Sequence, residues 1–105
     1  MTYRLSDRQL SELVLLVSVS NIVDLFPDYS PAKRTIYRRL ERWGISKPEQ
    51  ARKEFRRQLL LAAPPHLTDD DAEVLIDVKI QAMLEDLRTS IESEAKIHEE
   101  RFSND

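Results

Sequence analysis

The placement of proline and glycine constrains the fold of this chain more than any other feature. Its 105 residues include one glycine, Gly44, and five prolines, at positions 27, 31, 48, 64 and 65. The stretches between them are rich in Leu, Glu and Arg, which favour helix. Proline is excluded from helix interiors, and glycine commonly stops a helix. The sequence therefore predicts an all-α protein whose helix boundaries lie at these residues.

Four helices are predicted, over residues 6–26, 31–43, 47–63 and 69–102. The first begins with a capping box, Ser6 with Gln9, and is apolar almost all round, which is typical of a buried helix. Its run of β-branched residues leaves a strand over residues 14–19 as the alternative. A second capping box, Ser46 with Glu49, predicts the start of the third helix. Thr68, followed by three aspartates, predicts the start of the fourth.

The helix at 31–43 is the most distinctive of the four. Ser30 is predicted to cap it, Pro31 to occupy its first position, and Gly44 to supply a left-handed stop. The pattern therefore predicts a short helix with both of its ends defined by the sequence.

Two faces of this helix differ in character. Ile36, Leu40 and Trp43 follow one another at i, i+4 and i+7, and we expect all three to lie in the core. The residues expected to point away from that stripe are Arg34, Thr35, Arg38 and Arg42, with Lys33 and Arg39 on its flanks. One face is thus apolar and the other strongly basic.

Charge is segregated along the chain, although the formal net charge is only -3. Residues 1–30 carry a net charge of -2, residues 31–58 carry +7, and residues 59–105 carry -8. Such an arrangement predicts a molecule with one basic surface, which the overall charge conceals.

A helix that is apolar on one face and basic on the other suits the major groove of DNA. The residues predicted to reach base edges are Arg34, Thr35, Arg38 and Arg42. Those predicted to hold phosphates are Lys33, Arg39, Lys47, Arg52 and Arg56. RNA is less favoured, because Tyr37 is the only aromatic side chain in the basic segment that is free for stacking.

The segment Thr35-Ile36-Tyr37-Arg38-Arg39-Leu40, followed by Gly44-Ile45, resembles the recognition helix of bacterial helix-turn-helix proteins. The pattern is similar to the Fis-type C-terminal domain of bacterial enhancer-binding regulators, with a partial match over about residues 22–45. This resemblance implies a small bacterial or phage transcription regulator that binds double-stranded DNA.

The acidic segment after residue 63 has several interpretations. We expect residues 1–63 to form the helix-turn-helix-like unit and residues 64–105 to add an acidic helix, in one compact domain. An apolar seam along residues 69–102 predicts a homodimer, although the seam could instead bind a partner protein or cover the first helix of the same chain. The residues of the seam are Ile80, Leu84, Leu87, Ile91, Ala95, His98 and Phe102. An alternative function is that of a helical adaptor or inhibitor whose basic patch binds an acidic protein.

Other classes of function are disfavoured by the composition. There is no cysteine, no apolar run of the roughly 20 residues that span a bilayer, and no secretion-signal pattern at the N-terminus. We therefore expect a cytoplasmic protein without membrane contact. No phosphate-binding glycine loop or nucleophile–histidine pair is present, and capping explains Asp69–Asp71 better than a metal does. Neither enzyme activity nor a cofactor is expected.

Overall fold

The computed structural model describes residues 3–103, with side chains for residues 3–101. Within that range it contains five helices and no strand: α1 (Asp7–Leu13), α2 (Val19–Leu25), α3 (Lys33–Arg42), α4 (Pro48–Leu61) and α5 (Asp69–Ser103). The predicted all-α class is confirmed. The number of helices differs from the four expected, because the first predicted helix is broken in two.

The break falls in the β-branched stretch between residues 14 and 18, so the prediction of one helix over 6–26 was wrong. The capping box at Ser6 and Gln9 is confirmed, but α1 ends at Leu13. Ser18 then caps α2, with its hydroxyl accepting a hydrogen bond from the Asn21 amide at 3.2 Å. A single helix that is apolar all round would leave part of its surface uncovered in so small a protein. Two short helices can each bury one face.

Two of the predicted helix starts were also displaced. Ser30 does not cap α3, because it lies two residues before the cap, Ala32, and its hydroxyl donates to the Pro31 carbonyl at 2.8 Å. Pro31 also lies before the helix. Ser46 lies one residue too early to cap α4. The residue before a proline is pushed out of the helical region, so Lys47 becomes the cap, with φ at -131°, and Pro48 begins the helix.

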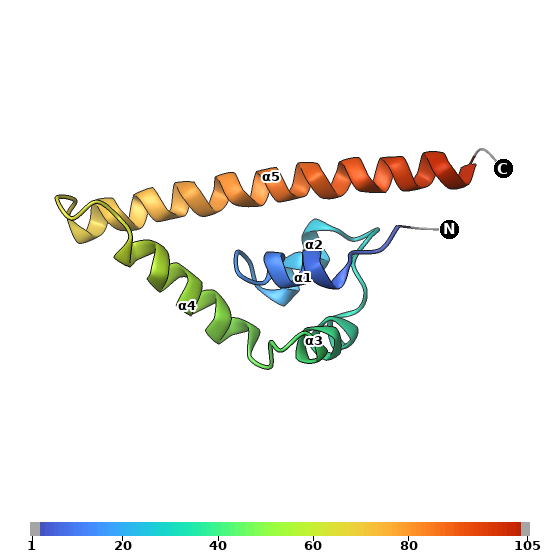
Figure 1. Ribbon diagram of the computed structural model, residues 1–105, viewed down its shortest axis with the longest axis horizontal. Helices are drawn as coiled ribbons and strands as arrows, with labels where there is room; N and C mark the ends of the chain where they lie inside the picture. Colours follow the sequence, from blue (N-terminus) through green and yellow to red (C-terminus); the bar gives the residue numbers. More distant parts are fainter. Residues whose placement is uncertain (1–2, 104–105) are drawn as a thin grey trace.

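The long helix α5 matches its prediction to within one residue. Thr68 caps it as expected, because its hydroxyl accepts a hydrogen bond from the Asp71 amide at 3.1 Å. The molecule measures 58 × 26 × 19 Å, and α5 runs along the longest dimension (Figure 1). Below α5 lie α1 and α2, with α3 beneath them. From the end of α3, α4 runs obliquely to the start of α5.

The core is centred on α1 and α2, which pack against α3 on one side and against the middle of α5 on the other. Its buried side chains are Leu5, Leu10, Leu13, Val14, Val19, Ile22, Phe26, Ile36, Leu40, Leu84 and Ile91. Two of these, Leu84 and Ile91, belong to the α5 seam, and Leu87 packs against the same cluster. The seam therefore packs within the chain, as the alternative interpretation anticipated. The side chain of Phe102, predicted as its last member, lies outside the described residues.

Candidate nucleic-acid interface

Helix α3 is fixed to the rest of the molecule by its apolar face. Ile36 and Leu40 are fully buried in the core, and α3 contacts both α1 and α2. Burying two such side chains contributes roughly 3–6 kcal/mol to folding. These two core positions are as the sequence predicted, and they orient the opposite face of α3 toward solvent.

The C-terminal end of α3 is a Schellman motif. Gly44 has φ +93°, as the predicted left-handed stop requires, and its amide donates to the Glu41 carbonyl at 3.0 Å. The Ile45 amide donates to the Leu40 carbonyl at 2.8 Å, and the Ile45 side chain packs against the core. This motif characteristically brings the residue after the glycine back onto the helix.

Trp43 lies outside the core, contrary to the prediction. Its side chain is 53% exposed, although it continues the stripe of Ile36 and Leu40 in angle. The stripe ends early because the chain reverses at Gly44 and Ile45 takes the remaining place against the core. Tyr37 is also half exposed, so α3 presents two aromatic side chains to solvent rather than the one expected.

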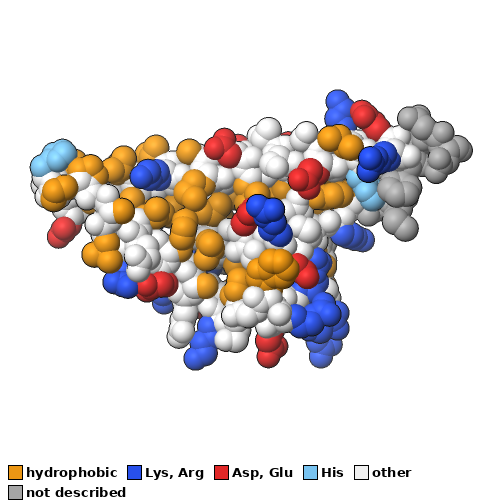
Figure 2. Space-filling view, in the orientation of Figure 1, with side chains coloured by type: hydrophobic (Ala, Val, Ile, Leu, Met, Phe, Trp, Pro, Cys, Tyr) orange, Lys and Arg blue, Asp and Glu red, His pale blue; other side chains and the backbone are white. Residues whose placement is uncertain are grey.

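The outer face of α3 is basic. Arg34, Arg38 and Arg42 are exposed at successive four-residue intervals, which place them along one side of the helix. None of the three forms an ion pair with any residue that the structure describes. Figure 2 shows blue side chains gathered at the lower right, in the region under α1 and α2 where Figure 1 places α3. One acidic residue, Glu41, is exposed on the same helix.

The remaining predicted contact residues lie in different surroundings. Lys33 is exposed at the start of α3 and Lys47 is exposed at the start of α4, whereas Thr35 is only partly exposed. Arg52, on α4, is also partly buried and borders a hollow beside Arg56. The structure thus brings Lys33, Lys47 and the three outer arginines of α3 onto exposed surface near that helix.

Arg39 is held inside the molecule. Its Nε donates to the Asp7 carboxylate on α1, and its second guanidinium nitrogen donates to the Leu5 carbonyl at 2.9 Å. The side chain is only 20% exposed. Arg39 therefore joins α3 to α1 and to the segment before it, a role that the sequence pattern did not indicate.

Arg56 also has partners within the chain. It pairs with Glu73 and, at 2.8 Å, with Asp77, both on α5. These carboxylates raise the pKa of Arg56, through hydrogen bonds first and charge attraction second. The acidic helix thus neutralises this α4 arginine while leaving the outer arginines of α3 without an ion pair in the described chain.

A cluster of side-chain hydrogen bonds, which the sequence did not reveal, joins the N-terminal segment to α5. The Tyr3 hydroxyl lies 2.9 Å from Gln9 Oε1 and 3.0 Å from the Glu94 carboxylate, and Gln9 donates to the same carboxylate at 2.8 Å. Burial raises the pKa of Tyr3. The Leu5 amide also donates to the Tyr29 carbonyl at 3.0 Å. These bonds fix the segment that receives the Arg39 guanidinium.

The described part of the chain holds neither a metal-binding cluster nor a membrane-spanning helix. No group of three or more His, Asp or Glu side chains there is arranged to hold a metal ion. None of the helices within residues 3–103 combines the length and the apolar character that crossing a bilayer requires. The candidate site is the exposed basic face of α3, which carries Arg34, Arg38 and Arg42.

No family model, no curated protein and no solved structure matches this chain.

Proposed function

We propose that this protein binds double-stranded DNA with α3 as its recognition helix and acts as a small transcription regulator. The observation that carries the proposal is the outer face of α3. Arg34, Arg38 and Arg42 project from a helix whose other face is locked into the core, and no carboxylate of the described chain pairs with them. A helix held in this way can lie in a major groove without unfolding any part of the core.

Distinct roles follow for the basic residues. The three outer arginines would meet base edges, where arginine pairs best with guanine. Lys33, at the start of α3, and Lys47, at the start of α4, would meet phosphates and set the position of the protein on the duplex. Arg39 would act indirectly, by holding α3 against α1.

Fluorescence anisotropy with mixed-sequence duplex DNA tests the proposal. On mixed-sequence DNA the three arginines have no preferred bases to pair with, so all five exposed basic residues can meet phosphates. Raising the salt concentration from 50 to 200 mM would then weaken binding by about 500-fold. Measurable binding with a steep salt dependence is expected. Absence of binding at 50 mM salt would refute the proposed function.

Matched triple variants test whether α3 is responsible. The test variant carries Arg34→Ala, Arg38→Ala and Arg42→Ala. The control carries Lys53→Ala, Arg57→Ala and Arg88→Ala, which removes the same charge from residues that each pair with a carboxylate of their own helix. We expect the test variant to lose DNA binding and the control to keep most of it. Equal losses would mean that only the overall charge matters.

Trp43 offers a direct reporter, because it is the only tryptophan in the chain. It is half exposed at the end of α3, so DNA seated on that helix should change its emission and protect it from iodide quenching. The emission change should share its midpoint with the anisotropy change. An anisotropy change with unaltered tryptophan emission would place the DNA elsewhere on the protein.

An acidic protein partner is the second candidate. It is favoured by the exposed Tyr37 and Trp43 beside the outer arginines, since Tyr, Trp and Arg dominate the binding energy of protein interfaces. This candidate predicts weak DNA binding without preference for any sequence. Selection from a random duplex library separates the two candidates: enrichment of a common sequence supports a regulator, and its absence supports the adaptor.

The predicted homodimer through residues 69–102 remains a proposal. Because the seam is covered within the chain, two copies would have to meet through the outer face of α5, where Val74 and Val78 are exposed. The molar mass in solution, measured by light scattering after gel filtration, tests this arrangement, with Val78→Lys as the variant expected to separate the copies.

A further inference from the structure

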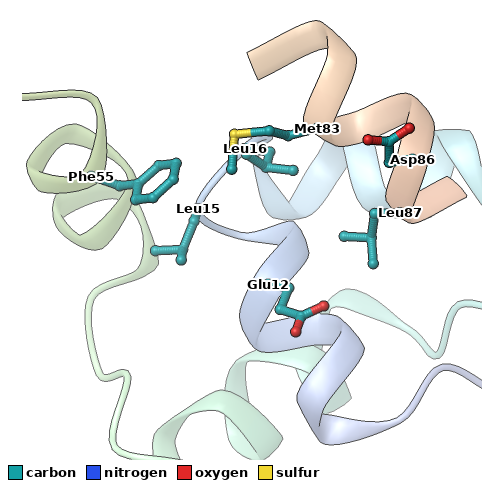
Figure 3. Close-up of a pocket in the computed structure, with 7 residues that line it drawn as sticks. All are labelled: Glu12, Leu15, Leu16, Phe55, Met83, Asp86 and Leu87. Carbon is teal, nitrogen blue, oxygen red and sulfur yellow. The ribbon is translucent and has the colours of Figure 1, made fainter. Parts of the chain in front are cut away.

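An apolar groove separates α4 from α1 and the middle of α5. Figure 3 shows Phe55 reaching from α4 toward Leu15, with Met83 of α5 nearby. Leu16 and Leu87 complete the apolar lining. All five side chains are partly exposed, and no residue of α3 lines the groove. The groove is therefore separate from the candidate DNA-binding face.

The size of the groove limits what can occupy it. Its volume is about 500 Å³, within the range of small-molecule sites. One turn of a helix with its side chains is a cylinder about 10 Å wide and 5.4 Å tall, or roughly 400 Å³. The groove therefore accommodates little more than one helical turn, whereas helix recognition uses anchors spread over at least two turns. A small molecule fits better than a partner helix.

The charges that line the groove are both negative. Glu12 comes from α1 and Asp86 from α5, and in Figure 3 they lie on the side of the groove away from Phe55. Glu12 forms a solvent-exposed ion pair with Arg8 at 3.4 Å, and exposed ion pairs of this kind contribute little to stability. Asp86 has no ion pair with any residue that the structure describes. No basic side chain lines the groove, so the charges of its lining favour a cation over an anion.

We propose that this groove binds a small hydrophobic cation, such as an aromatic amine or a quaternary ammonium or phosphonium compound. The apolar part of the ligand would lie between Phe55, Leu15 and Met83. Its positive charge would lie near Glu12 and Asp86. Phe55 adds an aromatic ring, to which a cation is also attracted.

Two probes of equal shape and opposite charge test the charge preference. Tetraphenylphosphonium and tetraphenylborate differ mainly in the sign of their charge. In isothermal titration with the full chain, we expect the phosphonium to bind saturably at one site, with an affinity at least tenfold higher than that of the borate. Equal binding of the two probes, or no binding of either, would overturn the proposal.

Neutralising the two carboxylates tests their contribution. The double variant Glu12→Gln and Asp86→Asn keeps the shape of the groove, and both changes lie on exposed side chains. We expect it to lower the phosphonium affinity by about three- to tenfold, the effect of two partly exposed charge interactions. The control Asp28→Asn with Glu99→Gln removes the same charge away from the groove and should leave the affinity unchanged. Equal effects in the two variants would contradict the assignment.

Filling the groove tests its location. Met83 is 38% exposed, so Met83→Trp can enlarge the side chain without disturbing the buried core. We expect this variant to lose phosphonium binding, whereas Val78→Trp, on another face of α5, should retain it. If Met83→Trp instead separates a dimer of the free protein and no probe binds the parent, a second copy occupies the groove and the proposal is wrong. This test is independent of DNA binding.

Discussion

The Arg39 guanidinium of α3 meets the Asp7 carboxylate at the first turn of α1, across 32 residues of sequence. The same guanidinium reaches the Leu5 carbonyl, so one side chain connects α3, α1 and the segment before α1. Asp7 also lies where the helix dipole favours a negative charge. This contact ties the basic helix to the body of the protein at a point far from its exposed face.

Replacing Arg39 by Ala should therefore destabilise the fold. The change leaves a partly buried carboxylate and a backbone carbonyl without their donor, which costs about 1–3 kcal/mol. Urea denaturation measures the loss. Arg88→Ala is the control, because its pair with Glu92 is exposed and should contribute no more than about 0.5 kcal/mol. Similar losses in the two variants would show that the Arg39 contact adds nothing beyond a surface pair.

Leu40 and Trp43 lie on one angular stripe of α3 but differ completely in burial. Leu40→Ala should destabilise the protein by about 2–5 kcal/mol, because it opens a cavity in the core. Trp43→Ala should cost much less, about 1 kcal/mol or below, because half of the indole is already exposed. Thermal unfolding of both variants provides the measurement, and a larger loss for Trp43→Ala would place the indole in the core.

Helical periodicity identified Ile36 and Leu40 as core residues but could not place Trp43. Periodicity gives the angle of a side chain around a helix, not the length over which neighbouring elements cover that helix. The glycine stop was visible in the sequence, and it already implied that the residue after it folds back. Ile45 in that position was the available signal that Trp43 would be displaced from the core.

The helix predicted over residues 6–26 shows a different limit of prediction from sequence. Its apolar residues were recognised as buried, and the break between them was not. Ser18 carried the signal, since serine strongly favours the position before a helix. The apolar residues on both sides of Ser18 favour one continuous buried helix, and this pattern outweighed the capping signal. The long-range contacts of Arg39 and Arg56 left no local pattern at all, because their partners lie far away in sequence.

Ser18, which caps α2, and Ser46, which was predicted to cap α4 but does not, should respond differently to substitution. Ser18→Ala should cost about 1 kcal/mol, the usual effect of losing a side-chain cap. Ser46→Ala should be nearly neutral, because Ser46 does not cap α4. Chemical denaturation of both variants checks the difference, and equal losses would argue for a cap at Ser46.

Glu41 allows the outer face of α3 to be tested through a gain of DNA affinity instead of a loss. It is the exposed carboxylate of α3 and would lie close to phosphates if that helix enters a groove. Glu41→Gln should therefore raise DNA affinity by about twofold to fivefold, the effect of removing one partly screened repulsion. Anisotropy at 100 mM salt gives the affinity. Glu99→Gln, on the far end of α5, is the control and should leave the affinity unchanged.

The Glu54 carboxyl on α4 should make the stability of the protein depend on pH. Hydrogen bonds from Arg57 first and Gln58 second lower the pKa of this carboxyl from 4.5 to about 2. Because the folded pKa is depressed, the contribution of Glu54 to stability is present above pH 4.5 and is lost as the pH falls toward 2. Arg57→Ala should raise this pKa back toward its ordinary value, as measured by NMR titration of the Glu54 carboxyl. Lys53→Ala, which removes a lysine paired with Glu49 instead, should leave it near 2. A carboxyl that titrates near 4.5 in the parent protein would show that the Arg57 contact does not persist in solution.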